Sequence, residues 1–239
     1  MTDRKIEEAL DKAAAAIPHD VDPTVLERIA GAVHSSMEPV RLLPRSGVLI
    51  LAVLLSTGGL AVATACWMGF AGFRALGMLQ RAIIFPVLAV LAWVTTRELV
   101  NQWIPGSRRY LAPTSLVVLV SVALLSVFAL ELHDYRAEHF VSAGVACLSV
   151  GVLQAIPVAC LAAWLLRRGF AVAPVSAGTL AGALGGISGV VMLELHCPNL
   201  EAPHVLVWHV GVVVVSALVG AVAGWVAGRG GRAGAPGIR

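Results

Sequence analysis

Six long apolar segments follow a polar stretch of about 46 residues at the start of the chain. Each segment is close to the roughly 20 residues that an α-helix needs to cross the hydrocarbon core of a bilayer. The pattern therefore predicts an all-α integral membrane protein with six transmembrane helices and a short N-terminal helical tail. Arg97 and Glu98 make the second segment the least apolar of the six. The predicted spans are about 47–69, 82–104, 113–132, 141–166, 172–194 and 204–228.

The polar tail, residues 1–46, has the spacing of two short amphipathic helices. Its apolar residues recur every three or four positions in two runs, and each run ends at a proline. Two stripes of this size bury little apolar surface, so we expect the tail to be partly disordered until it binds a partner protein. Its eight acidic and six basic residues argue against a membrane-surface helix, which favours Lys and Arg. The residues expected to contact the partner are Ile6, Leu10, Leu26, Ile29 and Val33.

The basic residues are concentrated on one side of the predicted spans. Fourteen Lys and Arg residues lie in the tail, in two of the loops and after the last span, against three in the remaining loops. An excess of Lys and Arg marks the cytoplasmic side of a membrane protein. Both termini, including the short C-terminal tail 229–239, are therefore expected in the cytoplasm. The net charge of +3 is too small to favour direct binding of nucleic acid.

The predicted spans hold few groups that could carry transport or catalysis. Their mid-membrane candidates are Gln154, Pro86, Pro157 and His209, which we interpret as interhelical hydrogen bonds and helix kinks. No Asp lies in any span, no serine has a GxSxG context, and the four cysteines form no CxxC. We therefore expect neither an enzyme nor a protein that requires a cofactor.

The two loops expected on the outer side differ from the rest of the chain. They contain four histidines, one cysteine and five carboxylates, and Cys147 lies two turns into the fourth span from the same side. Thiolate, imidazole and carboxylate are the ligands of zinc, copper and cadmium. Two other interpretations remain open: a disulfide between Cys147 and Cys197, or cysteines that only pack and histidines that are only solvated. The loop residues considered as ligands are Cys197, His133, His139, His196 and His204.

Small residues recur every fourth position in the last two spans. Gly178, Gly182 and Gly186 form one ladder, and Ser216, Gly220 and Gly224 form the other. Such ladders let two helix backbones approach closely in lipid. We expect a tight hairpin of the fifth and sixth helices; a contact between copies in a homo-oligomer is the alternative.

Several motifs resemble the NrsF-like family of membrane anti-sigma factors. They are the stretch from Cys147 to Pro157 (CLSVGVLQAIP), LLRRG at 165–169, LHCP at 195–198 and Trp208 before a Gly-rich helix. The segment MEPVRLLP at 37–44 also looks like the segment that precedes the family's first helix. The family more usually has Trp-Tyr where this chain has Trp208-His209, so a ligand role of His209 would be particular to this chain.

The resemblance implies a bacterial inner-membrane protein whose cytoplasmic tail holds an extracytoplasmic-function sigma factor inactive. The signal would be a heavy-metal ion or oxidative stress acting on the outward-facing Cys147 and Cys197. Two other functions remain as alternatives. One is a small metal or solute transporter with the outer cluster as its entry site, and the other is a membrane thiol oxidoreductase that uses the same two cysteines.

Overall fold

The computed structural model describes residues 7–8, 12, 22–36, 44–104, 106–107, 110–138, 140–166 and 173–233 of the 239. The chain divides into two units, Met1–Leu42 and Leu43–Arg239. Regular structure in the described residues is helical, apart from one isolated bridge between Asp134 and Glu201.

The first unit contains helix α2, Pro23–Ser36. The helix begins where it does because the Asp22 carboxylate accepts hydrogen bonds from the Thr24 backbone N–H at 2.9 Å and from its hydroxyl at 2.8 Å. Three of the predicted contact residues, Leu26, Ile29 and Val33, lie on α2 with about half of their surface exposed. Ile6 and Leu10 lie outside the described residues.

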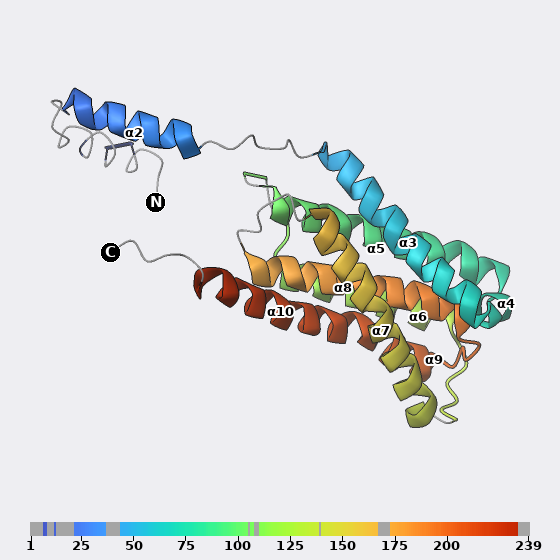
Figure 1. Ribbon diagram of the computed structural model, residues 1–239. Helices are drawn as coiled ribbons and strands as arrows, with labels where there is room; N and C mark the ends of the chain where they lie inside the picture. The colour runs from blue at the N-terminus through green and yellow to red at the C-terminus, as the bar shows by residue number, and fades with distance from the viewer. Residues whose placement is uncertain are drawn as a thin grey trace. The chain divides into compact units, whose positions relative to one another are not determined.

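The second unit contains six helices that are long and apolar enough to cross a membrane, which confirms the predicted fold class. Figure 1 shows them as one bundle. The last span begins with a short turn, α9 (Ala202–His204), and a π-helical turn, η1 (Val205–His209), before its main helix. The main helices are α3 (Ser46–Met68), α5 (Met78–Trp103), α6 (Pro113–Glu131), α7 (Phe140–Leu166), α8 (Pro174–His196) and α10 (Val210–Ala233).

Helix α5 continues through the charged pair that interrupts its apolar run, and it begins four residues before the predicted position 82. The Glu98 side chain is buried and accepts a hydrogen bond from the Tyr110 backbone N–H at 3.4 Å. The Arg97 guanidinium lies over the Tyr110 ring, 4.8 Å from its centroid. Both charged side chains therefore have partners near the end of the helix, as a membrane-spanning segment requires.

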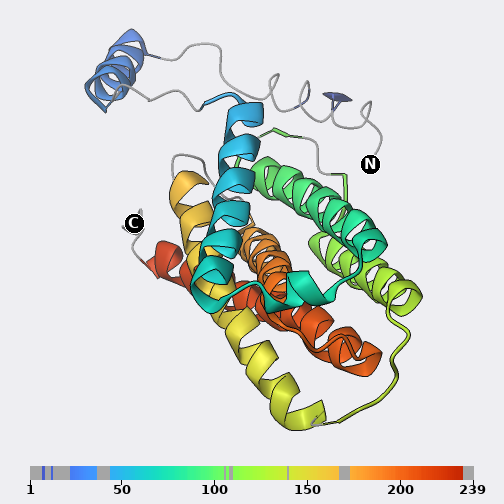
Figure 2. The same ribbon diagram turned by 90° about the vertical axis from the view of Figure 1, so that its right-hand side faces the viewer.

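Helix α8 is the centre of the bundle. Figure 2 shows it surrounded by the other long helices, and most of its length is buried, with Leu180, Leu184 and Ile187 fully covered. Between α3 and α7, the Thr64 hydroxyl donates to Gln154 Oε1 at 2.8 Å. This hydrogen bond is the interhelical role expected for Gln154.

The glycine ladders hold α8 against α10 at backbone distance. A Cβ atom at Gly178 would collide with the carbonyl oxygen of Gly220, and one at Gly182 with the carbonyl oxygen of Ser216. Neither position tolerates a side chain while the two helices keep this spacing. The predicted hairpin of the last two spans is therefore confirmed, with both ladders used inside one chain.

Candidate functional site

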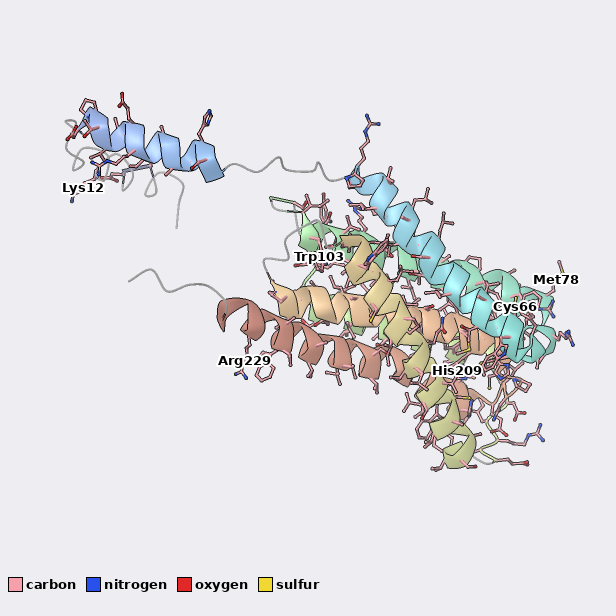
Figure 3. The ribbon with its side chains drawn as sticks, viewed as in Figure 1. Lys12, Cys66, Met78, Trp103, His209 and Arg229 are labelled. Carbon is pink, nitrogen blue, oxygen red and sulfur yellow. The ribbon has the colours of Figure 1, made fainter. Side chains whose placement is uncertain are left out.

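Cys147, Cys197, His204 and His209 come together at one end of the bundle. Each offers one ligand atom, and the four atoms all lie within 4.8 Å of one another. Figure 3 places His209 at the end of the bundle that also carries Cys66 and Met78, whereas Trp103 and Arg229 lie toward the other end. We call these four residues the Cys2His2 cluster.

Two distances define the centre of the Cys2His2 cluster. Cys147 Sγ lies 3.6 Å from Cys197 Sγ, and Cys197 Sγ lies 3.7 Å from His204 Nε2. Cys197, His204 and His209 are buried, and Cys147 is partly exposed. The cluster therefore brings two sulfur and two imidazole groups into a space largely closed to solvent.

The π-helical turn η1 explains how the two histidines meet. His209 follows His204 by five positions, which is about 1.4 turns of an α-helix and would place the rings on different faces. In η1 the N–H of Val210 bonds to the carbonyl of Val205, the i to i+5 pattern of a π-helix. That wider turn brings residues five apart toward the same face, and the two rings meet edge to face with centroids 5.2 Å apart.

Glu194 holds the inner histidine. His209 Nδ1 lies 2.7 Å from Glu194 Oε1, and both side chains are buried. The other ring nitrogen, Nε2 of His209, is buried and has no hydrogen-bond partner among the described residues. A buried polar atom without a partner calls for an explanation, because leaving it unsatisfied is costly.

Close packing of α7 on the last span sets the position of Cys147. A Cβ atom at Gly144 would collide with the Trp208 ring, and one at Gly151 would lie 2.6 Å from Val212 Cγ2. The Trp208 ring also packs against Phe140, with centroids 5.5 Å apart. Two glycines thus let α7 approach η1 and α10 closely enough for Cys147 to reach the cluster.

A short helix, α4 (Ala71–Ala75), supports Cys197 from the other side. A Cβ atom at Gly72 would lie 2.7 Å from the Glu194 carbonyl oxygen and 2.9 Å from the Cys197 backbone nitrogen. Cys197 itself caps α8, with its N–H bonded to the Leu193 carbonyl at 2.7 Å. Its contact with the Cys147 thiol and its burial raise the pKa of the Cys197 thiol, and the neighbouring His204 and His209 rings oppose this shift.

The other histidines considered as ligands lie outside the Cys2His2 cluster or outside the described residues. His133 is exposed on the loop between α6 and α7 and is not in the cluster. His196 Nδ1 instead lies 3.1 Å from the Gly69 carbonyl oxygen. His139 lies outside the described residues. The two loops do meet, because the Ala202 N–H donates to the Asp134 carbonyl at 2.6 Å, but they meet through backbone atoms.

The sequence alone did not predict the pairing of His209 with Glu194. The expected role of His209 was an interhelical hydrogen bond, and Glu194 was counted among the loop carboxylates. The structure extends α8 to His196, so Glu194 is a buried helical residue that faces His209. The hydrogen bond to Glu194 confirms the expected role of His209, and it uses only one of the two ring nitrogens, Nδ1.

A protein-family model described as "Negative regulator of sigma F" (NrsF) matches residues 34–229. The chain belongs to the NrsF family. The matched range contains the whole Cys2His2 cluster and all six candidate membrane spans, but only the last three residues of α2. No curated protein and no solved structure matches the chain.

Membership gives the chain its general role. It is a membrane protein of an anti-sigma-factor family, with a sigma factor as its implied partner and a regulatory task in transcription. The family resemblance seen in the sequence motifs is thereby confirmed.

Proposed function

We propose that this NrsF-family chain holds an extracytoplasmic-function sigma factor inactive at the bacterial inner membrane and releases it when a heavy-metal ion or an oxidant acts on Cys147 and Cys197. The observation that carries the proposal is the 3.6 Å separation of the two sulfur atoms, which come from residues fifty positions apart in the chain. Two thiols at this distance are close enough to bind one metal ion together, and an oxidant that joins them has to bring them only about 1.5 Å closer.

The charge distribution supports an orientation with both termini in the cytoplasm. Fourteen basic residues border the spans on one side and three on the other. In this orientation the Cys2His2 cluster lies at the outer end of the bundle, and the N-terminal tail meets cytoplasmic proteins. A signal received at the cluster then has to cross the bundle to reach the tail.

Helix α2 is the described part of the proposed sigma-factor contact. Leu26, Ile29 and Val33 recur at helical spacing, and about half of each side chain is exposed. An apolar stripe on one face of a helix is the form in which amphipathic helices dock into hydrophobic grooves. Ile6 and Leu10 extend the same proposal to the segment before α2.

The free energy that the signal supplies can be compared with the free energy that release of the partner requires. Moving a partner from 99% bound to 99% free takes about 5.5 kcal/mol of differential binding. A disulfide typically contributes about 2–4 kcal/mol, whereas a structural zinc site contributes about 10–16 kcal/mol. A disulfide is therefore smaller than the required difference, whereas metal coordination is large enough to supply it.

The test is capture of candidate sigma factors by the full-length chain in membranes. Leu26→Asp and Ile29→Asp should abolish capture, because each adds a charge to the apolar stripe. Ser35→Asp adds the same charge to the opposite face of α2 and serves as the matched control. The proposal fails if no sigma factor is captured, or if Ser35→Asp and Leu26→Asp have equal effects.

The sensing half of the proposal needs a separate measurement. Cys147→Ser combined with Cys197→Ser should leave capture intact and remove release by cadmium ions or by a thiol oxidant. A double variant that still releases the sigma factor normally would show that these cysteines do not receive the signal.

A further inference from the structure

We propose that the Cys2His2 cluster is a tetrahedral site for one thiophilic divalent cation of the zinc and cadmium class, and that Glu194 is its positioning residue. In the function proposed above, this site is where the metal signal is received, so its regulatory role rests on that proposal. Binding of the ion itself is measurable without any sigma factor.

Two of the six distances between the ligand atoms match edges of a tetrahedral site, and all six are at most 4.8 Å. With metal–sulfur and metal–nitrogen bonds of about 2.3 and 2.1 Å, tetrahedral angles place two sulfurs about 3.8 Å apart and a sulfur and a nitrogen about 3.6 Å apart. The two sulfurs lie 3.6 Å apart, and Cys197 Sγ lies 3.7 Å from His204 Nε2. A disulfide would instead need the sulfurs to approach by about 1.5 Å.

The kind and number of ligands select the class of ion. Two thiolates and two imidazoles in a tetrahedral arrangement suit zinc and cadmium, whereas calcium and magnesium require oxygen ligands. Two thiolates also balance the two charges of the ion, which favours binding in a buried place. On binding, the two thiol protons leave to solvent and the two imidazoles bind as neutral rings.

Glu194 prepares His209 for this role. In the neutral ring that binds a metal, the Glu194 carboxylate at 2.7 Å favours the proton on His209 Nδ1 as a hydrogen-bond donor, so Nε2 carries the lone pair. Nε2 is the buried atom that has no partner among the described residues, so a metal ion supplies what it lacks. A carboxylate that orients a ligating histidine is a recurrent feature of metal sites.

Cys147 is the natural point of entry. It alone of the four ligands is partly exposed, while the other three are buried. Cys147 also belongs to α7, whereas the other three lie at or between the ends of α8 and α10. An ion bound first by Cys147 would therefore join α7 to the α8–α10 pair.

The experiment titrates metal-free, full-length protein in detergent with Cd²⁺ alone. We expect one ion per chain by elemental analysis and the ultraviolet charge-transfer absorption of cadmium thiolate. Cys147→Ser, His204→Gln and His209→Gln should each weaken binding. Glu194→Gln should weaken it about 10- to 100-fold, the usual effect of removing such an orienting group. His133→Ala and His196→Ala are the matched controls and should bind as the unchanged protein does.

Three outcomes would overturn the site: no bound Cd²⁺ in the unchanged protein, His209→Gln binding as tightly as the unchanged protein, or His133→Ala weakening binding as much as His209→Gln. A thermal unfolding midpoint close to that of the unchanged protein shows which variants are folded. If the variants at buried positions do not fold, Cys147→Ser, at the partly exposed position, still tests the site.

Failure of the site and failure of the proposed function give different results. If Cd²⁺ does not bind but a thiol oxidant still releases a captured sigma factor through the two cysteines, the regulatory function stands and the metal site is wrong. If one Cd²⁺ binds through all four residues but no sigma factor is captured, the site stands and the proposed function is wrong.

Discussion

His209 Nδ1 lies 2.7 Å from Glu194 Oε1, and the two side chains are fully enclosed by the bundle. The pair joins the end of α8 to the start of the last span at a depth where water cannot replace either partner. Its value to the fold is the satisfaction of two polar groups that would be costly to leave unpaired.

Removing the acceptor should therefore destabilise the metal-free bundle. Glu194→Leu leaves Nδ1 of His209 without a partner and is expected to cost about 1–3 kcal/mol. Glu194→Gln keeps a carbonyl acceptor at the same place and should cost less. Thermal unfolding in detergent measures both, and equal destabilisation by the two substitutions would contradict the role assigned to the hydrogen bond.

The backbone contact between α8 and α10 makes a second prediction. Gly182→Val introduces a side chain against the Ser216 carbonyl and should destabilise the bundle by at least the 1–3 kcal/mol typical of overpacking. Gly58→Val is the matched control, because a Cβ atom at Gly58 meets nothing within 4 Å. A similar loss of stability for both variants, measured by thermal unfolding, would count against the hairpin.

Cd²⁺ binding should also depend on a residue that is not a ligand. Gly144→Leu collides with the Trp208 ring and should push α7 away from η1, which carries Cys147 out of reach. We expect Cd²⁺ affinity to fall at least tenfold although all four ligands remain. Gly211→Ala, where the nearest atom would be Leu148 Cδ1 at an ordinary 3.7 Å, should leave the affinity unchanged.

Helix α2 should lose its cap in acid. Hydrogen bonds from the Thr24 N–H and then the Thr24 hydroxyl lower the pKa of Asp22. A depressed pKa in the folded helix means that the cap stabilises α2 above the ordinary pKa of the carboxyl, and that this support is lost as pH falls through the lowered value. Hydrogen-exchange protection of the Val25 and Leu26 amides, relative to the rate in an unfolded chain at the same pH, should fall there. Asp22→Asn keeps an acceptor and should remove this fall in protection.

The sequence was sufficient for the fold because bilayer thickness and apolar length are directly related. Six segments near 20 residues predicted six helices, and the small-residue ladders predicted which pair packs most closely. The start of α5 was misplaced by four residues, since Arg81 and Gln80 read as loop residues. In the structure Gln80 closes the helix start, accepting from the Gly77 N–H at 2.8 Å.

Only part of the site could be predicted from the sequence. Cys147, Cys197 and His204 carry types of side chain that bind metals and lie near one end of their spans. The contact between His204 and His209 depends on a π-helical turn, and a 3.6-residue period places those rings apart. The role of Glu194 depends on two further residues of helix, which turn a loop carboxylate into a buried one.

The glycine ladders have a mechanical consequence. At the ladder positions α8 and α10 touch backbone to backbone, and no side chain lies between them there to absorb a displacement, so we expect the two helices to move as one rigid unit. Cys197, His204 and His209 are attached to the ends of these two helices, whereas Cys147 is on α7. We therefore expect α7 to be the helix that moves when an ion or an oxidant draws the four residues together. Pro157, which interrupts the hydrogen bonding of α7 about two thirds of the way along the helix, gives that helix a place to bend.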